Sequence, residues 1–146
     1  MTTTSPATAP ALTPALAPAT GGVVGWPRTW LRLEGLAALV AGIAAYRDLG
    51  GDWLWVIPGL LAVDLSMLGY VAGPQAGAIT YNLAHNWFSA LLVLGAGLAL
   101  NVPALALAGC LLVAHIGIDR LSGFGLKYPS AFGDTHLGWI GRSRPT

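Results

Sequence analysis

The chain has 146 residues, of which 55% are hydrophobic and only 9% are charged. An ordinary soluble domain is about one-quarter charged and less than half apolar, so the composition indicates an integral membrane protein. The formal net charge is +1, which excludes the basic field of a nucleic-acid-binding protein. The single cysteine, Cys110, lies in an apolar run and is expected to be a small buried hydrophobic residue.

The N-terminal segment, residues 1–25, consists mainly of Thr, Ala and Pro. Prolines at positions 6, 10, 14 and 18 remove helix hydrogen bonds at every turn, so we expect a disordered tail. The segment lacks the basic region and compact apolar core of a secretory signal, and we do not interpret it as a cleaved leader. Residues 26–146 are expected to form the membrane domain.

Four apolar segments follow, at about residues 30–46, 53–70, 76–100 and 103–121. The shortest reaches the roughly 20 residues that cross about 30 Å of hydrocarbon when its flanking residues are included. Pro58 predicts a kink in the second segment. Because the connecting turns are short, consecutive segments must run antiparallel. The sequence therefore predicts an all-α fold, a four-helix transmembrane bundle.

The antiparallel order brings the ionisable residues of these segments into one half of the membrane. Glu34 lies near the start of the first segment, Asp64 late in the second and His85 in the first half of the third. His115 and Asp119 lie near the end of the fourth segment. At a rise of about 1.5 Å per residue their depths overlap, so we expect the last four to converge on one pocket. For Glu34, a role as an interfacial residue favoured by the helix dipole is an alternative of equal weight to a functional role.

His115 and Asp119 are one helical turn apart and share a helix face. Ionisable groups within a membrane helix are costly, which makes the pair a candidate functional site. Imidazoles with carboxylates form the ligand set expected for Zn, Fe or Mn. We predict a divalent metal held by residues from several segments, with a loop histidine as a further candidate: Asp64, His85, His115, Asp119 and His136.

The same pocket contains the candidate catalytic residues, namely Asp64, His85, His115, Asp119, Glu34 and Tyr81. Glu34 or a spare aspartate could serve as a general base toward water activated by the metal. Tyr81, one turn before His85, could orient a ligand or protonate a leaving group. Its alternative is a packing aromatic.

The glycine-rich segment from Ser122 to Gly138 is expected to fold over the pocket mouth as a lid. Lys127 and Tyr128 could contact an anionic or aromatic substrate, or anchor the loop at lipid headgroups. His136 lies in the same loop, where a plain surface role is the alternative to a functional one.

The positive charges indicate the orientation. Arg47 alone falls on the side away from the pocket, and the others fall on the pocket side: Arg28, Arg32, Arg120, Lys127, Arg142 and Arg144. By the positive-inside rule, both termini and the pocket mouth face the cytoplasm. We therefore expect a multi-pass protein of the bacterial inner (cell) membrane.

Several motifs occur together in order: Asp64-Leu-Ser-Met-Leu-Gly-Tyr70, Tyr81-Asn-Leu-Ala-His85, Ala114-His-Ile-Gly-Ile-Asp-Arg120, Gly125-Leu-Lys-Tyr-Pro129 and Asp134-Thr-His-Leu-Gly138. On these motifs the chain resembles, from about Leu31 to Gly141, a bacterial family of small membrane proteins, domain of unknown function family 4260. The resemblance implies a compact four-span protein with characteristic residues at Glu34, Asp64, His85, His115, Asp119, Lys127 and His136. It implies no activity, and the long N-terminal tail departs from the family pattern.

Our principal hypothesis is a membrane-embedded, metal-dependent enzyme that acts on a lipophilic small molecule. A metal-free acid–base pocket would use Asp–His pairs that shift each other's pKa. A proton-coupled transporter would need polar groups in the other half of the membrane, or a homo-oligomer around a pore. A structural or assembly protein would use the Asp–His pairs to pin helices together. The lipid bilayer is the partner common to all of these hypotheses.

Overall fold

The computed structural model describes residues 22–141, so most of the expected tail at 1–25 lies outside the described residues. The fold is mostly helical: α1 (Trp26–Asp48), η1 (Trp53–Trp55), α2 (Val56–Val63), η2 (Asp64–Ala72), α3 (Pro74–Ala84), α4 (Trp87–Ala99) and α5 (Pro103–Ser122). Elements η1 and η2 are 3₁₀ helices. Two short strands follow, β1 (Asp134–Thr135) and β2 (Gly138–Trp139).

The helix boundaries have clear local causes. A proline stands in the first turn of α1, α3 and α5, where its missing N–H has no intrahelical partner in any case. Gly123 ends α5 in the left-handed conformation, which glycine adopts without a Cβ clash. At the start of α4, the side-chain oxygen of Asn86 accepts a hydrogen bond from the Ser89 N–H at 2.9 Å.

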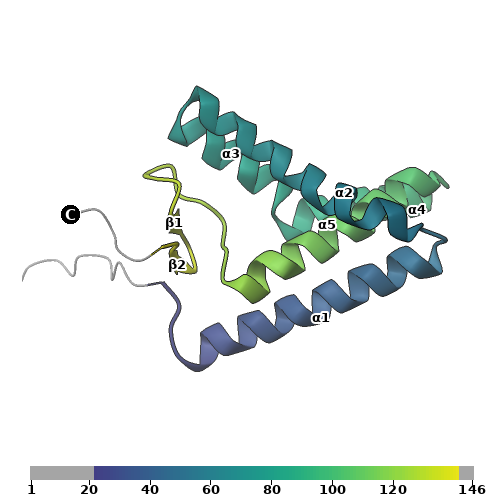
Figure 1. The fold of residues 1–146 in the computed structure, drawn as a ribbon, viewed down its shortest axis with the longest axis horizontal. Helices are drawn as coiled ribbons and strands as arrows, with labels where there is room; N and C mark the ends of the chain where they lie inside the picture. Colours follow the sequence, from purple (N-terminus) through teal and green to yellow (C-terminus); the bar gives the residue numbers. More distant parts are fainter. Residues whose placement is uncertain (1–21, 142–146) are drawn as a thin grey trace, which may run out of the picture.

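Helix α5 lies at the centre of the arrangement. It runs antiparallel beside α1, packs against α4, and also contacts α2 (Figure 1). The continuous helical stretch from η1 through α2 to η2 returns toward the chain's starting side, and α3 lies along η2 (Figure 1). Consequently α5 is the most buried helix, and residues on it face three neighbouring elements.

Glycines allow α5 to approach its neighbours closely. A Cβ on Gly42 of α1 would lie 2.8 Å from the Ala114 nitrogen of α5. On the other side, a Cβ on Gly109 of α5 would lie 2.4 Å from the Leu94 Cα of α4. Because these contacts are to backbone atoms, a side chain could fit only if the helices moved apart.

Among residues 22–141, two helical stretches are long and apolar enough to cross a membrane, Trp53–Ala72 and Pro103–Ser122, each of 20 residues. The apolar helix α4 is shorter. The two long stretches differ in environment, since 56% of the second but only 6% of the first is buried within the protein. Length and composition alone also fit a buried core helix, and this alternative applies to α5 but not to Trp53–Ala72.

The segment expected at 76–100 consists of two helices rather than one. The chain breaks at His85 and Asn86, where Asn86 adopts an extended conformation with φ −116° and ψ 151°. The capping bond of Asn86 stabilises a new helix start at this point. The break places His85 at the end of α3, beside α5. A second change of geometry occurs at Asp64, where α2 becomes the 3₁₀ helix η2.

The C-terminal segment lies between the end of α5, the end of α3 and the start of α1 (Figure 1). Strand β1 pairs with β2 in antiparallel fashion, and Lys127 forms an isolated bridge with Thr135. The Asn82 side chain of α3 holds this segment with two hydrogen bonds: its Nδ2 donates to the Lys127 carbonyl at 2.9 Å, and its Oδ1 accepts from the Lys127 N–H at 2.7 Å. The segment is therefore tied to α3 by its backbone.

Candidate functional site

Three potential ligand atoms from three elements meet at one point. They are Asp64 Oδ1 at the start of η2, His85 Nε2 at the end of α3 and His115 Nε2 on α5. The two imidazole nitrogens are 3.1 Å apart, and each lies 3.5 Å from the carboxylate oxygen. A tetrahedral zinc ion with bonds of about 2.0–2.1 Å holds neighbouring ligand atoms about 3.4 Å apart. The triangle therefore has the dimensions of one face of such a site.

The hydrogen bond on the far side of the His85 ring favours metal ligation. His85 Nδ1 lies 2.9 Å from the Tyr81 carbonyl oxygen, which can only accept, so Nδ1 carries the proton. In the neutral ring this leaves the Nε2 lone pair directed at His115 and Asp64. The His85 side chain is fully buried, and the Tyr81 ring stacks on it with a centroid distance of 3.8 Å. Such fixation of the tautomer and orientation is typical of histidines that bind metals.

Asp119 lies just outside this triangle. Its carboxylate oxygens are 3.8 Å from His85 Nε2 and 3.9 Å from His115 Nε2. The Tyr81 hydroxyl donates a hydrogen bond to Asp119 Oδ2 at 2.8 Å. The expected convergence of Asp64, His85, His115 and Asp119 is thus present in the structure, and Tyr81 joins the group through Asp119.

A cavity of about 360 Å³ adjoins the triangle. It is lined by Asp64, Met67, Tyr81, Asp119, Phe124, Lys127, Phe132 and Ile140. The Asp64 side chain is 44% exposed, whereas the two histidines are buried. The Asp64 carboxylate is therefore the corner of the triangle that a molecule in the cavity would reach first.

Lys127 supplies the cation of this cavity. Its Nζ donates a hydrogen bond to the Phe132 carbonyl at 2.8 Å and lies 3.7 Å from the centroid of the Phe132 ring. Burial lowers the pKa of Lys127 below its usual range, and the Asp119 carboxylate partly offsets this effect. The ammonium thus lies among aromatic rings on the side of the cavity formed by the C-terminal segment.

The remaining candidate residues lie elsewhere. Glu34 and His136 line a second cavity, separate from the triangle. His136 Nδ1 accepts a hydrogen bond from the Leu126 N–H at 2.8 Å, so this nitrogen is engaged within the loop. Tyr128 is half exposed and lines neither cavity.

A family model described as "Domain of unknown function (DUF4260)" matches residues 28–140. The chain belongs to this family. No curated protein and no solved structure matches the DUF4260 chain. The family's description names no activity, so it assigns no chemistry to the residues of this DUF4260 protein.

Arg120 is a buried residue of the DUF4260 site whose role the sequence pattern does not predict beyond its positive charge. Arg120 is 6% exposed, and its guanidinium donates hydrogen bonds to the His85 carbonyl at 2.9 Å and the Phe124 carbonyl at 2.6 Å. It therefore links the end of α3 to the chain that leaves α5. Its signal in the sequence is an arginine inside a predicted membrane helix, directly after Asp119, where a charge is costly.

The two tyrosines of α3 and η2 allow a matched test of the Asp119 contact. In Tyr81→Phe the buried Asp119 carboxylate loses a donor, so we expect the free energy of unfolding to fall by about 1–3 kcal/mol. The Tyr70 hydroxyl is buried and has no hydrogen-bond partner among the described residues. Tyr70→Phe should therefore leave stability unchanged or raise it slightly. Chemical unfolding of the purified variants measures both free energies. Equal losses of stability in the two variants would show that the Tyr81–Asp119 hydrogen bond contributes no more than the Tyr70 hydroxyl does.

Proposed function

We propose that this DUF4260 protein is a multi-pass membrane protein with a metal centre, and that it is an enzyme acting on a lipophilic small molecule. The observation that carries the proposal is the triangle of Asp64, His85 and His115, whose ligand atoms are 3.1–3.5 Å apart. Two imidazoles and one carboxylate are a ligand set found at catalytic zinc sites, and the same donors also suit iron or manganese.

Membrane location is supported by the exposed apolar surface. The stretch Trp53–Ala72 is apolar yet only 6% buried, so its side chains need lipid or another chain around them. We propose four membrane passes: α1, the stretch from η1 to η2, the broken pair α3 and α4, and α5. The expected orientation, with both termini and the pocket on the cytoplasmic side of a bacterial inner membrane, follows from the distribution of Arg and Lys.

The broken pass fits this proposal. Non-helical backbone at membrane depth is tolerated where it is buried in protein or lines a cavity. The His85 carbonyl, which the break frees from the helix pattern, accepts a hydrogen bond from Arg120. The carbonyl group at the interruption is thus hydrogen-bonded within the protein.

The residues around the triangle have distinct roles in the proposed chemistry. A bound divalent ion with an open position supplies Lewis acidity and lowers the pKa of water. Asp119, held by the Tyr81 hydroxyl, is placed to exchange a proton beside the two imidazoles. Lys127 is placed to hold an anionic or carbonyl oxygen of the substrate, while the apolar side chains of the cavity hold its hydrocarbon part.

The distances within the group also favour a second candidate, a non-catalytic role. Without an ion, His115 can carry its proton on Nε2 and donate it to His85 Nε2 at 3.1 Å. Protonated imidazoles can also pair with Asp64 and Asp119 at 3.5–3.9 Å. In this case the group relays protons or pins α3, α5 and η2 together.

Metal analysis of the purified protein tests the proposal. The protein is extracted in mild detergent without chelators, and its metal content is measured by mass spectrometry. We expect one divalent ion per chain, and we expect the Co²⁺-substituted protein to show the intense visible absorption of a four-coordinate site. Failure to bind Zn²⁺, Fe²⁺, Mn²⁺ or Co²⁺ after each is added would refute the metal centre and leave the second candidate.

A further inference from the structure

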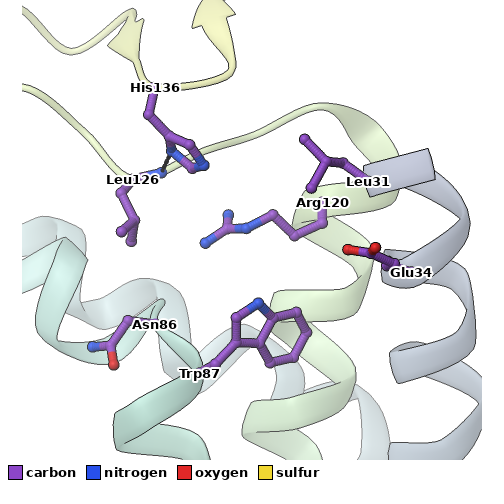
Figure 2. Close-up of a pocket in the computed structure, with 8 residues that line it drawn as sticks. Leu31, Glu34, Asn86, Trp87, Arg120, Leu126 and His136 are labelled. Carbon is purple, nitrogen blue, oxygen red and sulfur yellow. Dashed lines mark hydrogen bonds between the residues drawn. The ribbon is translucent and has the colours of Figure 1, made fainter. Parts of the chain in front are cut away.

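A second cavity, of about 160 Å³, is lined in part by Arg120 and shares no lining residue with the first cavity. The start of α1, the end of α5, the start of α4 and the C-terminal loop surround it (Figure 2). It is lined by Leu31, Glu34, Gly35, Asn86, Trp87, Arg120, Leu126 and His136. None of the three ligand atoms of the proposed metal centre belongs to this cavity, so it is a separate feature of the molecule.

Arg120 brings a buried positive charge to this cavity. Its two hydrogen bonds go to backbone carbonyls, and no carboxylate lies within 4.0 Å of its guanidinium among residues 22–141. Figure 2 shows the guanidinium extending into the space between His136 and Trp87. A guanidinium has five N–H donors, so it retains capacity for further acceptors. A buried charge of this kind is costly unless a partner compensates it.

His136 contributes a second donor. Its Nδ1 accepts a hydrogen bond from the Leu126 N–H, so the neutral ring carries its proton on Nε2. Burial, and then the positive charge of Arg120, lower the pKa of His136 below its ordinary value, which keeps this neutral form at pH 7. In Figure 2 the Nε2 side of the ring is turned toward Arg120.

The start of α4 adds a third donor. The indole ring of Trp87 lies below the Arg120 guanidinium, with its nitrogen turned toward it (Figure 2). An indole N–H can only donate. Trp87 is also the first residue of the 13-residue helix α4, whose N-terminus carries partial positive charge. The polar groups of Arg120, His136 and Trp87 are therefore donors. Of the acceptors that also line the cavity, the Asn86 side-chain oxygen is engaged by the Ser89 N–H, and the Glu34 carboxylate lies more than 4.0 Å from the guanidinium.

We propose that this cavity binds a phosphate group, held between the donors of Arg120, His136 and Trp87. Donors that approach from three elements suit a tetrahedral oxyanion, whose oxygens point in several directions. The phosphate could belong to a soluble molecule or to a phospholipid headgroup. Exposed tryptophans at the start of α1, Trp26 and Trp30, lie on the same end of the protein and are typical of the headgroup region.

The Glu34 carboxylate lowers the affinity expected for an anion in this cavity. Its exposed carboxylate lines the same cavity and is drawn beside the base of the Arg120 side chain in Figure 2. Since like charges repel, Glu34 should weaken the binding of a fully charged anion. We therefore expect Glu34→Gln to bind phosphate about 2- to 5-fold more tightly than the native protein, as expected for one exposed charge.

Calorimetric titration with inorganic phosphate is the first test. It uses detergent-solubilised, chelator-treated protein at pH 7 and constant ionic strength, because phosphate could otherwise coordinate a bound metal. We expect saturable binding that Arg120→Gln abolishes. Trp87→Phe and His136→Asn should each weaken it about 10-fold. Phenylalanine lacks the indole N–H, and asparagine keeps an acceptor for the Leu126 N–H but is too short to place an N–H at the position of His136 Nε2. The control Arg32→Gln removes a charge near the same helix start, outside the cavity, and should change the affinity less than about 2-fold.

Vesicles distinguish the two sources of phosphate. The same variants are reconstituted in phosphatidylcholine with and without phosphatidic acid, and protection of the protein against thermal unfolding is compared. Protection by phosphatidic acid that is lost in Trp87→Phe and His136→Asn assigns the site to a lipid headgroup, whereas binding of inorganic phosphate alone assigns it to a soluble ligand. Absence of binding in both experiments, or binding that these two variants do not weaken, would overturn the proposal. Because Trp87→Phe and His136→Asn leave the metal triangle intact, either result is independent of the metal centre.

Discussion

His85→Ala is expected to lower the affinity of the protein for Zn²⁺ by at least about 100-fold. Binding at zinc sites amounts to about 10–16 kcal/mol shared among the ligands, so removal of one ligand has an effect of this size or larger. The His85 Nε2 atom is a corner of the triangle and its ring is the most deeply buried of the three ligands. Competition with a chromophoric chelator measures the change.

The three histidines of the chain provide matched controls for this result. His115→Ala should resemble His85→Ala, because His115 Nε2 is 3.1 Å from His85 Nε2. His136→Ala removes the same side chain from the second cavity and should leave the Zn²⁺ affinity within about 2-fold of the native value. Circular dichroism checks that each variant keeps its helices. Equal losses of affinity in all three variants, or none in any, would show that the triangle does not hold the ion.

Gly109→Ala is expected to lower the free energy of unfolding by about 1–3 kcal/mol, the usual cost of overpacking a tight core. The new Cβ would lie 2.4 Å from both the Leu94 Cα and the Leu94 nitrogen. Since these are backbone atoms, no side-chain rotation can relieve the contact, and α4 and α5 must separate. Thermal unfolding followed by circular dichroism measures the loss.

Gly95→Ala is the matched control on the neighbouring helix. A Cβ at Gly95 would have nothing within 4 Å, so this change involves no clash. Both substitutions gain the same intrinsic helix propensity, up to about 1 kcal/mol. Gly95→Ala should therefore leave stability unchanged or raise it, and the difference between the two variants isolates the packing of α4 on α5. A Gly109→Ala protein as stable as Gly95→Ala would mean that these helices are not held in close contact.

Much of the candidate site can be predicted from the amino-acid sequence alone. Polar residues are so rare in the apolar segments that their positions along antiparallel helices already predict overlapping depths for Asp64, His85, His115 and Asp119. The start of α5 at Pro103 agrees with the expected segment, whereas α1 and α3 begin at Trp26 and Pro74, a few residues before the expected starts at about 30 and 76, because a proline is accommodated best in a first turn. Membership of the DUF4260 family also agrees with the motifs that carry the resemblance.

The break at His85 and Asn86 was not predicted, and its cause explains why. An asparagine within an apolar segment is compatible with a continuous helix, and only the competition between its capping bond to Ser89 and the regular helix pattern decides the outcome. The tertiary contact that stabilises the break, from Arg120 to the His85 carbonyl, joins residues 35 positions apart. Hydropathy along the chain contains no information about such a bond.

The sequence by itself determined the helical class and the proximity of the four polar residues, because apolar composition and segment length control both. It did not determine how helices turn about their axes or where the C-terminal segment folds. Only the tertiary structure placed His136 and Glu34 beside Arg120 in a second cavity, away from the triangle of Asp64, His85 and His115. The physical reason is that depth follows from counting residues, whereas the direction of a side chain depends on the packing of neighbouring helices.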